Sequence, residues 1–125
     1  MRVLFVEDDD VSRVVVEATL RDCGIRVVSV SSAAEALDLL ESGIEPDLLL
    51  TDIQLPGDCD GCMLAEIFQD ELPDLPIIFI TAKPQGVHQV NNSVYLLKPL
   101  KPALLLEAIG AIAPARAGRL PARLH

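Results

Sequence analysis

The sequence lacks tryptophan, and aromatic residues make up only 3% of its 125 residues. Bases stack on aromatic side chains in single-stranded nucleic-acid sites, so this shortage argues against such a site. Basic residues are scarce as well, with 10 Lys and Arg against 19 Asp and Glu. The formal net charge of −9 disfavours contact with a phosphate backbone, and we expect no nucleic-acid partner.

Cysteines are few, and uncharged runs are short. Three cysteines are an odd number and form no complete disulfide framework, so we expect the reducing environment of the cytoplasm. No apolar run is long enough to span a bilayer, and the first residues do not resemble a secretory signal, so we expect no membrane contact. Half of the residues are hydrophobic, which in a chain of this length predicts one globular domain with its own core.

Short β-branched or leucine-rich runs recur along the chain, and helical patterns separate most of them. Three of these runs show no polar alternation, which is typical of strands that are covered on both faces of a parallel sheet. The predicted strands are residues 3–6, 27–30, 48–51, 77–80 and 94–97. Strands that alternate with helices predict a doubly wound α/β fold with right-handed crossovers.

Caps and apolar spacing predict four helices. The first follows strand 3–6 and ends at Gly24, a residue type that favours the position after a helix. Ser32 and Glu35 form a potential capping box at the start of the second. The third is predicted over Gly61–Glu71, and the fourth over Pro102–Ile112, where proline suits the first helical turn.

Two segments lack a helical pattern. Residues 83–93 contain proline, glycine and two asparagines without apolar spacing of three or four, and they predict a loop. Residues 114–125 contain three arginines and no periodicity, and we expect a mobile basic tail there. The predicted domain therefore covers residues 1–113.

Reactive side chains follow four of the five predicted strands. Glu7 and Asp8 follow the first strand, Asp52 the third, Thr81 the fourth and Lys98 the fifth. Ligands of open α/β sheets bind beyond the carboxyl ends of the strands, so these groups are expected to share one rim. Carboxylates that crowd together repel one another unless a hard cation lies among them, and Mg²⁺ prefers oxygen ligands. The sequence therefore predicts a magnesium site.

A carboxylate beside Mg²⁺ can attack phosphorus and form an aspartyl phosphate. The phosphoryl group brings close to two negative charges, which need donors. Lys98 can pair with one of its oxygens and the Thr81 hydroxyl with another, while the metal neutralises more of the charge. Asp9 and Asp10 have a simpler explanation, since acidic residues cap a helix and favour its N-terminal turn.

Four segments in this order resemble the receiver domain of two-component response regulators. They are residues 3–9, 47–56, 79–82 and 95–99, and the resemblance extends from residue 2 to about residue 112. It implies the flavodoxin-like strand order 2-1-3-4-5. It also implies a signalling module rather than an enzyme, one that assists its own phosphorylation and dephosphorylation. The donor would be a histidine kinase or a His-containing phosphotransfer protein, and phosphorylation would switch the binding of a downstream protein.

The resemblance implies individual roles at the rim. Asp52 would accept the phosphoryl group. Mg²⁺ would bind to the carboxylates of Glu7, Asp8 and Asp52 and to the main-chain carbonyl of Gln54. A glutamate stands at position 7, where the family commonly has aspartate.

The resemblance also implies a switch. Lys98 would pair with the phosphoryl group, and its bond to Pro99 is commonly cis in this family. Thr81 would be the switch hydroxyl, and Tyr95 the aromatic residue that changes rotamer as Thr81 moves. Gln54 and Lys83 occupy positions that tune the lifetime of the phosphoryl group.

Two segments depart from the family pattern. The turn over residues 56–61 is one residue longer than usual. The segment 83–93 is shorter than the family's by more than a helical turn, in the region that normally forms the fourth helix and a surface for dimerisation and output. We therefore expect a monomer.

Three other functions are alternatives to a phosphate-accepting signalling domain. A phosphatase with an aspartate nucleophile would need a second Asp two positions after Asp52, where this chain has Gln54. A flavodoxin-like cofactor protein would need a phosphate-binding loop after the first strand, where this chain is acidic. A phosphate-independent interaction module that retains the acidic pocket is the main alternative.

Cys59 and Cys62 form a C-x-x-C pattern at the start of the third predicted helix. A redox pair is conceivable, since a helix N-terminus lowers a thiol pKa. Half of a zinc site is also conceivable, but His88 and His125 are isolated and complete no ligand set. We expect Cys23 to be a small core residue.

Overall fold

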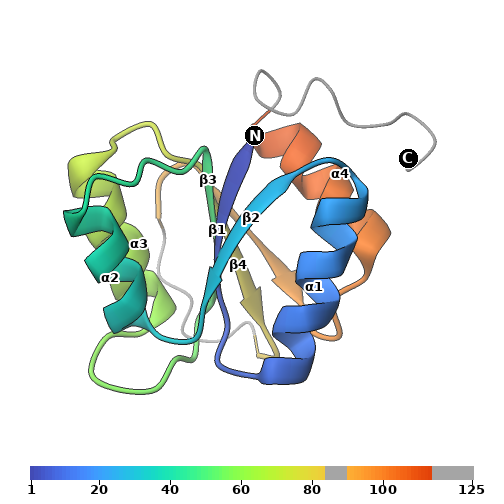
Figure 1. Cartoon of the computed structure of the whole chain (residues 1–125), viewed down its shortest axis with the longest axis horizontal. Coiled ribbons are helices and arrows are strands. Elements are labelled where there is room, and N and C mark those ends of the chain that lie inside the picture. Colours follow the sequence, from blue (N-terminus) through green and yellow to red (C-terminus); the bar gives the residue numbers. More distant parts are fainter. Residues whose placement is uncertain (84–89, 114–125) are drawn as a thin grey trace.

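Five parallel strands form a sheet at the centre of the computed structural model, which describes residues 1–83 and 90–113. The strands are β1 (Arg2–Val6), β2 (Arg26–Val30), β3 (Leu48–Asp52), β4 (Ile77–Thr81) and β5 (Ser93–Leu97). The helices are α1 (Asp10–Asp22), α2 (Ala33–Glu41), α3 (Gly61–Glu71) and α4 (Pro102–Ile112). The strand order is β2-β1-β3-β4-β5, and the predicted fold and strand order are therefore confirmed (Figure 1).

Helices cover both faces of the sheet. In Figure 1, α1 and α4 lie on one side, and α2 and α3 lie on the other. Successive side chains of a strand point to opposite faces, so Val3 and Phe5 of β1 pack in the cluster with α1 and α4, whereas Leu4 and Val6 pack in the cluster with α2 and α3. This double burial explains why the strand residues read as one uninterrupted apolar run.

Burial falls from the centre of the sheet to its β5 edge. Every residue of β3 and β4 is buried. Strand β5 lies at the edge, and the side chains of Val94, Tyr95 and Leu97 are exposed. The rigid part of the sheet is therefore β1, β3 and β4, whose carboxyl ends lead into the residues of interest.

Side-chain caps fix the starts of three helices. Asp9, Ser32 and Asp60 each accept a hydrogen bond from the main-chain N–H three residues further on. The first helix gives way to Gly24, which has a φ of +77° and so suits glycine. The predicted bounds of α3 and α4 are confirmed, and Asp9 is the N-cap that its position predicted.

The connection between β4 and β5 lies partly outside the described residues, which omit 84–89. Residues 83 and 90–92 form no helix and Ser93 begins β5, while the rest of the loop predicted for residues 83–93 lies outside the described residues. Gln69 of α3 donates to the main-chain carbonyl of Asn91 at 2.6 Å, and the Asn92 amide donates to the carbonyl of Asp74 at 3.0 Å. These bonds hold the end of the connection against the α3–β4 turn.

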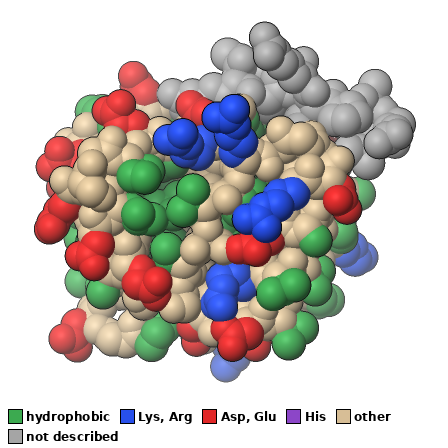
Figure 2. Space-filling model, in the orientation of Figure 1, with side chains coloured by type: hydrophobic (Ala, Val, Ile, Leu, Met, Phe, Trp, Pro, Cys, Tyr) green, Lys and Arg blue, Asp and Glu red, His purple; other side chains and the backbone are tan. Residues whose placement is uncertain are grey.

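The predicted mobile tail over residues 114–125 lies outside the described residues. Within the described ranges, none of the helices combines the length and the apolar content that crossing a membrane requires. Charged residues of both signs are scattered over the face drawn in Figure 2.

Gly61 is the point where α3 meets the end of β3. A Cβ atom at this position would lie 2.1 Å from the main-chain oxygen of Asp52 and 2.8 Å from the Cα of Ile53. The Gly61 N–H also donates to the carbonyl of Ile53 at 2.7 Å. The glycine therefore allows a close approach that no other residue type permits, and it sets the backbone position of Asp52.

We expect Gly61→Ala to lower the free energy of unfolding by about 1–3 kcal/mol, because the Asp52 backbone must shift to admit the methyl group. Gly110→Ala is the matched control, since nothing lies within 4 Å of the Cβ at that helical position. It should raise stability by up to about 1 kcal/mol. Urea unfolding of the three proteins measures both effects, and equal midpoints for Gly61→Ala and the unsubstituted chain would contradict the close approach.

Candidate functional site

The carboxyl ends of β1 and β3 bring three acidic side chains together. Glu7 and Asp8 directly follow β1, and Asp52 is the last residue of β3. The two strands are neighbours in the sheet, with Val6 opposite Thr51. One carboxylate oxygen from each acidic residue lies within 4.8 Å of the other two. The strand-end pattern thus identified three groups that the fold does bring together.

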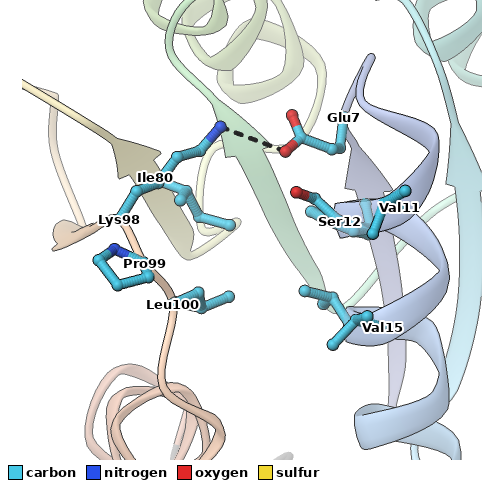
Figure 3. A pocket seen from close by; sticks show the side chains of 10 residues that line it. Glu7, Val11, Ser12, Val15, Ile80, Lys98, Pro99 and Leu100 are labelled. Carbon is cyan, nitrogen blue, oxygen red and sulfur yellow. Dashed lines mark hydrogen bonds and ion pairs between the residues drawn. The ribbon is translucent and has the colours of Figure 1, made fainter.

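Lys98 reaches this cluster from the other side of β4. Its Nζ lies 2.6 Å from Oδ2 of Asp52 and 3.2 Å from Oε1 of Glu7, and Figure 3 shows the second of these ion pairs. The Lys98 N–H donates to the carbonyl of Thr81 at 2.9 Å, which ties the base of the side chain to β4. The peptide bond between Lys98 and Pro99 is cis, as the resemblance implied.

The two carboxylates of these ion pairs are almost fully buried, whereas the lysine is not. The exposed fractions of the side chains are 2% for Glu7 and 8% for Asp52, against 33% for Lys98. Buried charges cost free energy unless partners compensate them. Two buried carboxylates share a single ammonium group here, so the pocket keeps an excess of negative charge.

Glu7 carries the clearest sign of this excess. Burial raises the pKa of Glu7 to about 7, the hydrogen bond and negative charge of Asp52 act in the same direction, and Lys98 offsets only part of the effect. Oε2 of Glu7 is buried and has no hydrogen-bond partner among the described residues. A buried oxygen in that situation is stabilised by a proton or by a cation.

Lys98 remains charged in this setting. Burial lowers the pKa of Lys98, but the hydrogen bond and charge of Asp52, followed by those of Glu7, outweigh burial and raise the pKa above its ordinary value. The lysine is therefore a permanent positive charge at the mouth of the pocket.

Hydrogen bonds from neighbouring residues of the chain hold Asp52 in place. The Gln54 N–H donates to Oδ1 of Asp52 at 3.1 Å, and the Thr51 hydroxyl donates to the Asp52 main-chain carbonyl at 2.8 Å. Oδ2 faces Lys98, so the two carboxylate oxygens have different partners. Asp52 is thus oriented toward the pocket by groups on both sides.

Comparison with known proteins decides what this arrangement is. Residues 3–110 match the response regulator receiver domain family. The chain belongs to this family. Receiver domains are generally signalling modules rather than enzymes, they take phosphoryl groups from histidine kinases or phosphotransfer proteins, and they generally bind Mg²⁺ at an acidic pocket.

Relatives of this receiver domain come from plants and bacteria. The two-component response regulator ARR12 of Arabidopsis thaliana is 36% identical over 107 residues, which cover 81% of this chain and 18% of that protein. A response regulator receiver protein from Sinorhizobium medicae WSM419 is 31% identical, with a TM-score of 0.86 over 93% of this chain and 96% of that one. The receiver domain of the hybrid histidine kinase CckA is 32% identical, with a TM-score of 0.78 over 90% of this chain and 99% of that one. The chain spans less than a fifth of the length of the curated relatives it matches.

The donor set of this receiver domain fits Mg²⁺. The three clustered groups are all carboxylates, the hard oxygen ligands that this ion prefers. Asp8 is exposed while Glu7 and Asp52 are buried, so the cluster opens toward solvent on one side and leaves room for the waters that Mg²⁺ usually keeps. The buried Oε2 of Glu7 adds a ligand atom that the described residues leave without a partner.

Thr81 and Tyr95 occupy different environments. The Thr81 hydroxyl is buried, donates to the Lys83 carbonyl at 2.7 Å and accepts from the Lys83 N–H at 3.1 Å. Tyr95 is half-exposed on the edge strand, opposite Phe79 of β4. The predicted switch roles of the two residues stay predictions, and the structure adds that Thr81 is bonded to the first residues of the β4–β5 connection.

The cysteines separate into core and loop residues. Cys23 is buried in the cluster with α1 and α4, as predicted. Burial and the nearby charge of Asp60 raise the pKa of the Cys59 thiol, and Cys62 is buried. The lowered thiol pKa that a redox pair would favour is therefore not found at Cys59, because desolvation and an acidic neighbour act against it.

One further residue near the site has little signature in the sequence. Arg13 of α1 donates from Nη1 to the main-chain carbonyl of Glu7 at 2.9 Å. It stands three residues after Asp10, a spacing that favours an ion pair on a helix, but contact with a carbonyl outside the helix depends on the tertiary fold.

Glu7→Gln should change how stability depends on pH in metal-free protein. Because the pKa of Glu7 is raised to about 7 from 4.5, the folded state binds more protons than the unfolded state between these values. The stability that this group contributes is present below pH 4.5 and lost as pH rises through 7. Glu7→Gln lacks this loss, so its stability relative to the unsubstituted chain should improve by about 1–3 kcal/mol between pH 5 and pH 8.

Urea unfolding with a chelator present, at both pH values, measures this difference. Glu41→Gln is the control, because Glu41 is an exposed glutamate at the end of α2. A relative stability of Glu7→Gln that stays constant across this interval would contradict the raised pKa.

Proposed function

We propose that this receiver domain takes a phosphoryl group from a phosphohistidine donor onto Asp52 and thereby switches the binding of a downstream protein. The supporting observation is the 2.6 Å ion pair between Lys98 and Asp52, where Asp52 is one of three carboxylates whose oxygens lie within 4.8 Å of one another. In this role the domain assists its own phosphorylation and dephosphorylation, without turning over a separate substrate.

The transfer balances in atoms and charge. A carboxylate oxygen of Asp52 attacks phosphorus, and the bond between phosphorus and the donor's imidazole nitrogen breaks, with its electron pair left on that nitrogen. The negative charge of the Asp52 carboxylate thereby passes to the departing imidazole, which becomes neutral by taking up a proton from solvent, while the phosphoryl oxygens still carry close to two negative charges. Lys98, the least buried of the three ion-paired side chains, can then pair with a phosphoryl oxygen.

Glu7, Asp8 and Asp52 would hold Mg²⁺, together with the main-chain carbonyl of Gln54. When bound, the ion neutralises charge on the transferring group. The protein's own part is to keep these oxygens close together before the ion arrives. Glu7 offers a ligand atom that is available to the ion, since its buried Oε2 has no partner among the described residues.

Thr81 would respond to the new charge by donating a hydrogen bond to a phosphoryl oxygen. Its hydroxyl now donates to the Lys83 carbonyl, so donation to a phosphoryl oxygen requires that this bond be given up. Phosphorylation would therefore be coupled to the first residues of the β4–β5 connection, and Tyr95 would change rotamer as Thr81 moves. The shift is limited to the difference in contact free energy between the two states.

The donor would dock on α1. A groove of about 240 Å³ opens between α1 and the Lys98–Leu100 segment, with Glu7 and Lys98 at its polar end (Figure 3). Val11 and Val15 line the groove, and they are 72% and 56% exposed. Exposed apolar side chains beside a reactive pocket mark a contact surface for a protein partner. The donor's histidine would reach Asp52 from this side.

Asp52→Asn should abolish phosphorylation by a small acyl phosphate in the presence of Mg²⁺. The asparagine keeps the size of the side chain but supplies no nucleophilic carboxylate oxygen. Intact-protein mass after incubation measures the added phosphoryl group. Asp58→Asn is the matched control, because Asp58 is exposed in the neighbouring loop, and it should be labelled like the unsubstituted chain.

Three outcomes of that experiment would contradict the proposal. They are label retained in Asp52→Asn, label unaffected by a chelator, or no label on the unsubstituted chain. Capture of a downstream partner that is equal for Asp52→Asn and the phosphorylated chain would instead favour the phosphate-independent interaction module.

Val15→Ser should slow transfer from a phosphorylated His-containing phosphotransfer protein while leaving labelling by the acyl phosphate at its normal rate. The small donor needs no protein contact surface, whereas the protein donor loses apolar contact area. Met63→Ser is the control, since Met63 is 48% exposed on α3, on the opposite side of the sheet. Equal transfer rates for Val15→Ser and Met63→Ser would rule out docking on α1.

A further inference from the structure

Arg13 connects α1 to the turn that carries two of the three clustered carboxylates. Its Nη1 donates to the main-chain carbonyl of Glu7 at 2.9 Å, and its Nη2 pairs with the carboxylate of Asp10. The Arg13 side chain is 21% exposed, so most of it lies beneath the turn, whereas Asp10 is on the surface. One guanidinium group therefore spans the turn from its first residue to the first residue of the helix.

The Glu7 main chain is held on both sides. Its N–H donates to the carbonyl of Val30 in β2 at 3.1 Å, and its carbonyl accepts from Arg13. The carbonyl belongs to the peptide plane that joins Glu7 to Asp8. A change in the backbone angle ψ of Glu7 would break the bond to Arg13 and would redirect the Cα–Cβ bond of Asp8.

Asp8 is the residue that depends most on this peptide. Glu7 and Asp52 are buried and packed, and both bond to Lys98, so several contacts fix their side chains. Asp8 is exposed, yet its carboxylate lies in the same 4.8 Å cluster. Packing does not hold the exposed Asp8 side chain in this cluster, so its position depends on the direction of the main chain at Asp8.

We propose that Arg13 is a positioning residue for the magnesium site, which fixes the peptide between Glu7 and Asp8 so that both carboxylates face Asp52. The inference rests on the proposed function, since it assumes that these carboxylates bind Mg²⁺. Groups that orient ligand residues without touching the metal typically change its affinity by 10–100-fold when they are replaced.

The chemistry of arginine suits this position. A planar guanidinium donates in two directions at fixed angles, so it can bond to the Glu7 carbonyl and to Asp10 at once. Lysine would keep the positive charge but lacks the fixed fork.

The test compares Mg²⁺ affinity, measured by isothermal titration calorimetry, across four proteins at one pH and ionic strength. We expect Arg13→Ala to weaken binding by about tenfold or more, and Arg13→Lys to weaken it by less. Arg21→Ala is the matched control, because Arg21 lies on the same helix and pairs with Glu17 at 3.6 Å, in the last turn. It should bind like the unsubstituted chain.

Amide hydrogen exchange of metal-free protein supplies a second readout. Arg13→Ala should speed exchange at the Glu7 amide, which donates to the Val30 carbonyl at 3.1 Å, while Arg21→Ala should not. If Arg13→Ala proves too unstable to purify, Asp10→Asn serves instead, because it removes the negative charge that pairs with Nη2 and leaves Arg13 in place. Asp10→Asn should weaken Mg²⁺ binding in the same direction.

The outcomes separate the two levels of the proposal. An unsubstituted chain that binds no Mg²⁺ would overturn the proposed function. A chain that binds Mg²⁺ with equal affinity before and after Arg13→Ala, or after Asp10→Asn when only that variant folds, would leave the proposed function standing and overturn the role of Arg13.

Discussion

The interaction of two buried carboxylates with one ammonium group constrains the arrangement of the strands in this structure. Glu7 and Asp52 come from neighbouring central strands, and Lys98 comes from the far side of β4. Their meeting requires β1, β3, β4 and β5 to be adjacent and parallel, so that their carboxyl ends share one rim. It also requires Lys98 to pass the end of β4, where the small side chain of Thr81 stands. The site can therefore form only with this strand order.

This cluster adds little to the stability of the fold. Buried ion pairs seldom repay the cost of removing their charges from water, and here the charges do not balance. Stability comes instead from the two apolar clusters on either face of the sheet, which fill the space under α1 and α4 and under α2 and α3. Because the core supports the site, the site can keep an excess of negative charge that a proton or a cation relieves. A proton or a cation can therefore bind in this pocket without loss of the packing that stabilises the fold.

Local chemistry explains which features could be predicted from the sequence. The strands β1, β3 and β4 are buried on both faces, so their apolar runs are continuous, and the caps at Asp9 and Ser32 act within one helical turn. Glu7, Asp8, Asp52 and Lys98 could be found because strand ends share a rim in any parallel sheet. Arg13 could not, because its bond to the Glu7 carbonyl depends on how α1 packs. The burial that raises the pKa of Cys59 depends in the same way on tertiary contacts.

The site residues also differ in what they are bonded to, and this difference suggests where a signal would leave the domain. Asp52 ends β3 and Glu7 directly follows β1, and both strands are packed on both faces, so a charge placed there has little backbone to move. Thr81 ends the last buried strand, and its hydroxyl bonds outward to Lys83. Beyond it lies β5, whose exposed side chains leave room for rearrangement. The proposed switch therefore acts where the buried strand β4 meets the sparsely packed edge strand β5. A conformational change costs least there, because few contacts must be broken.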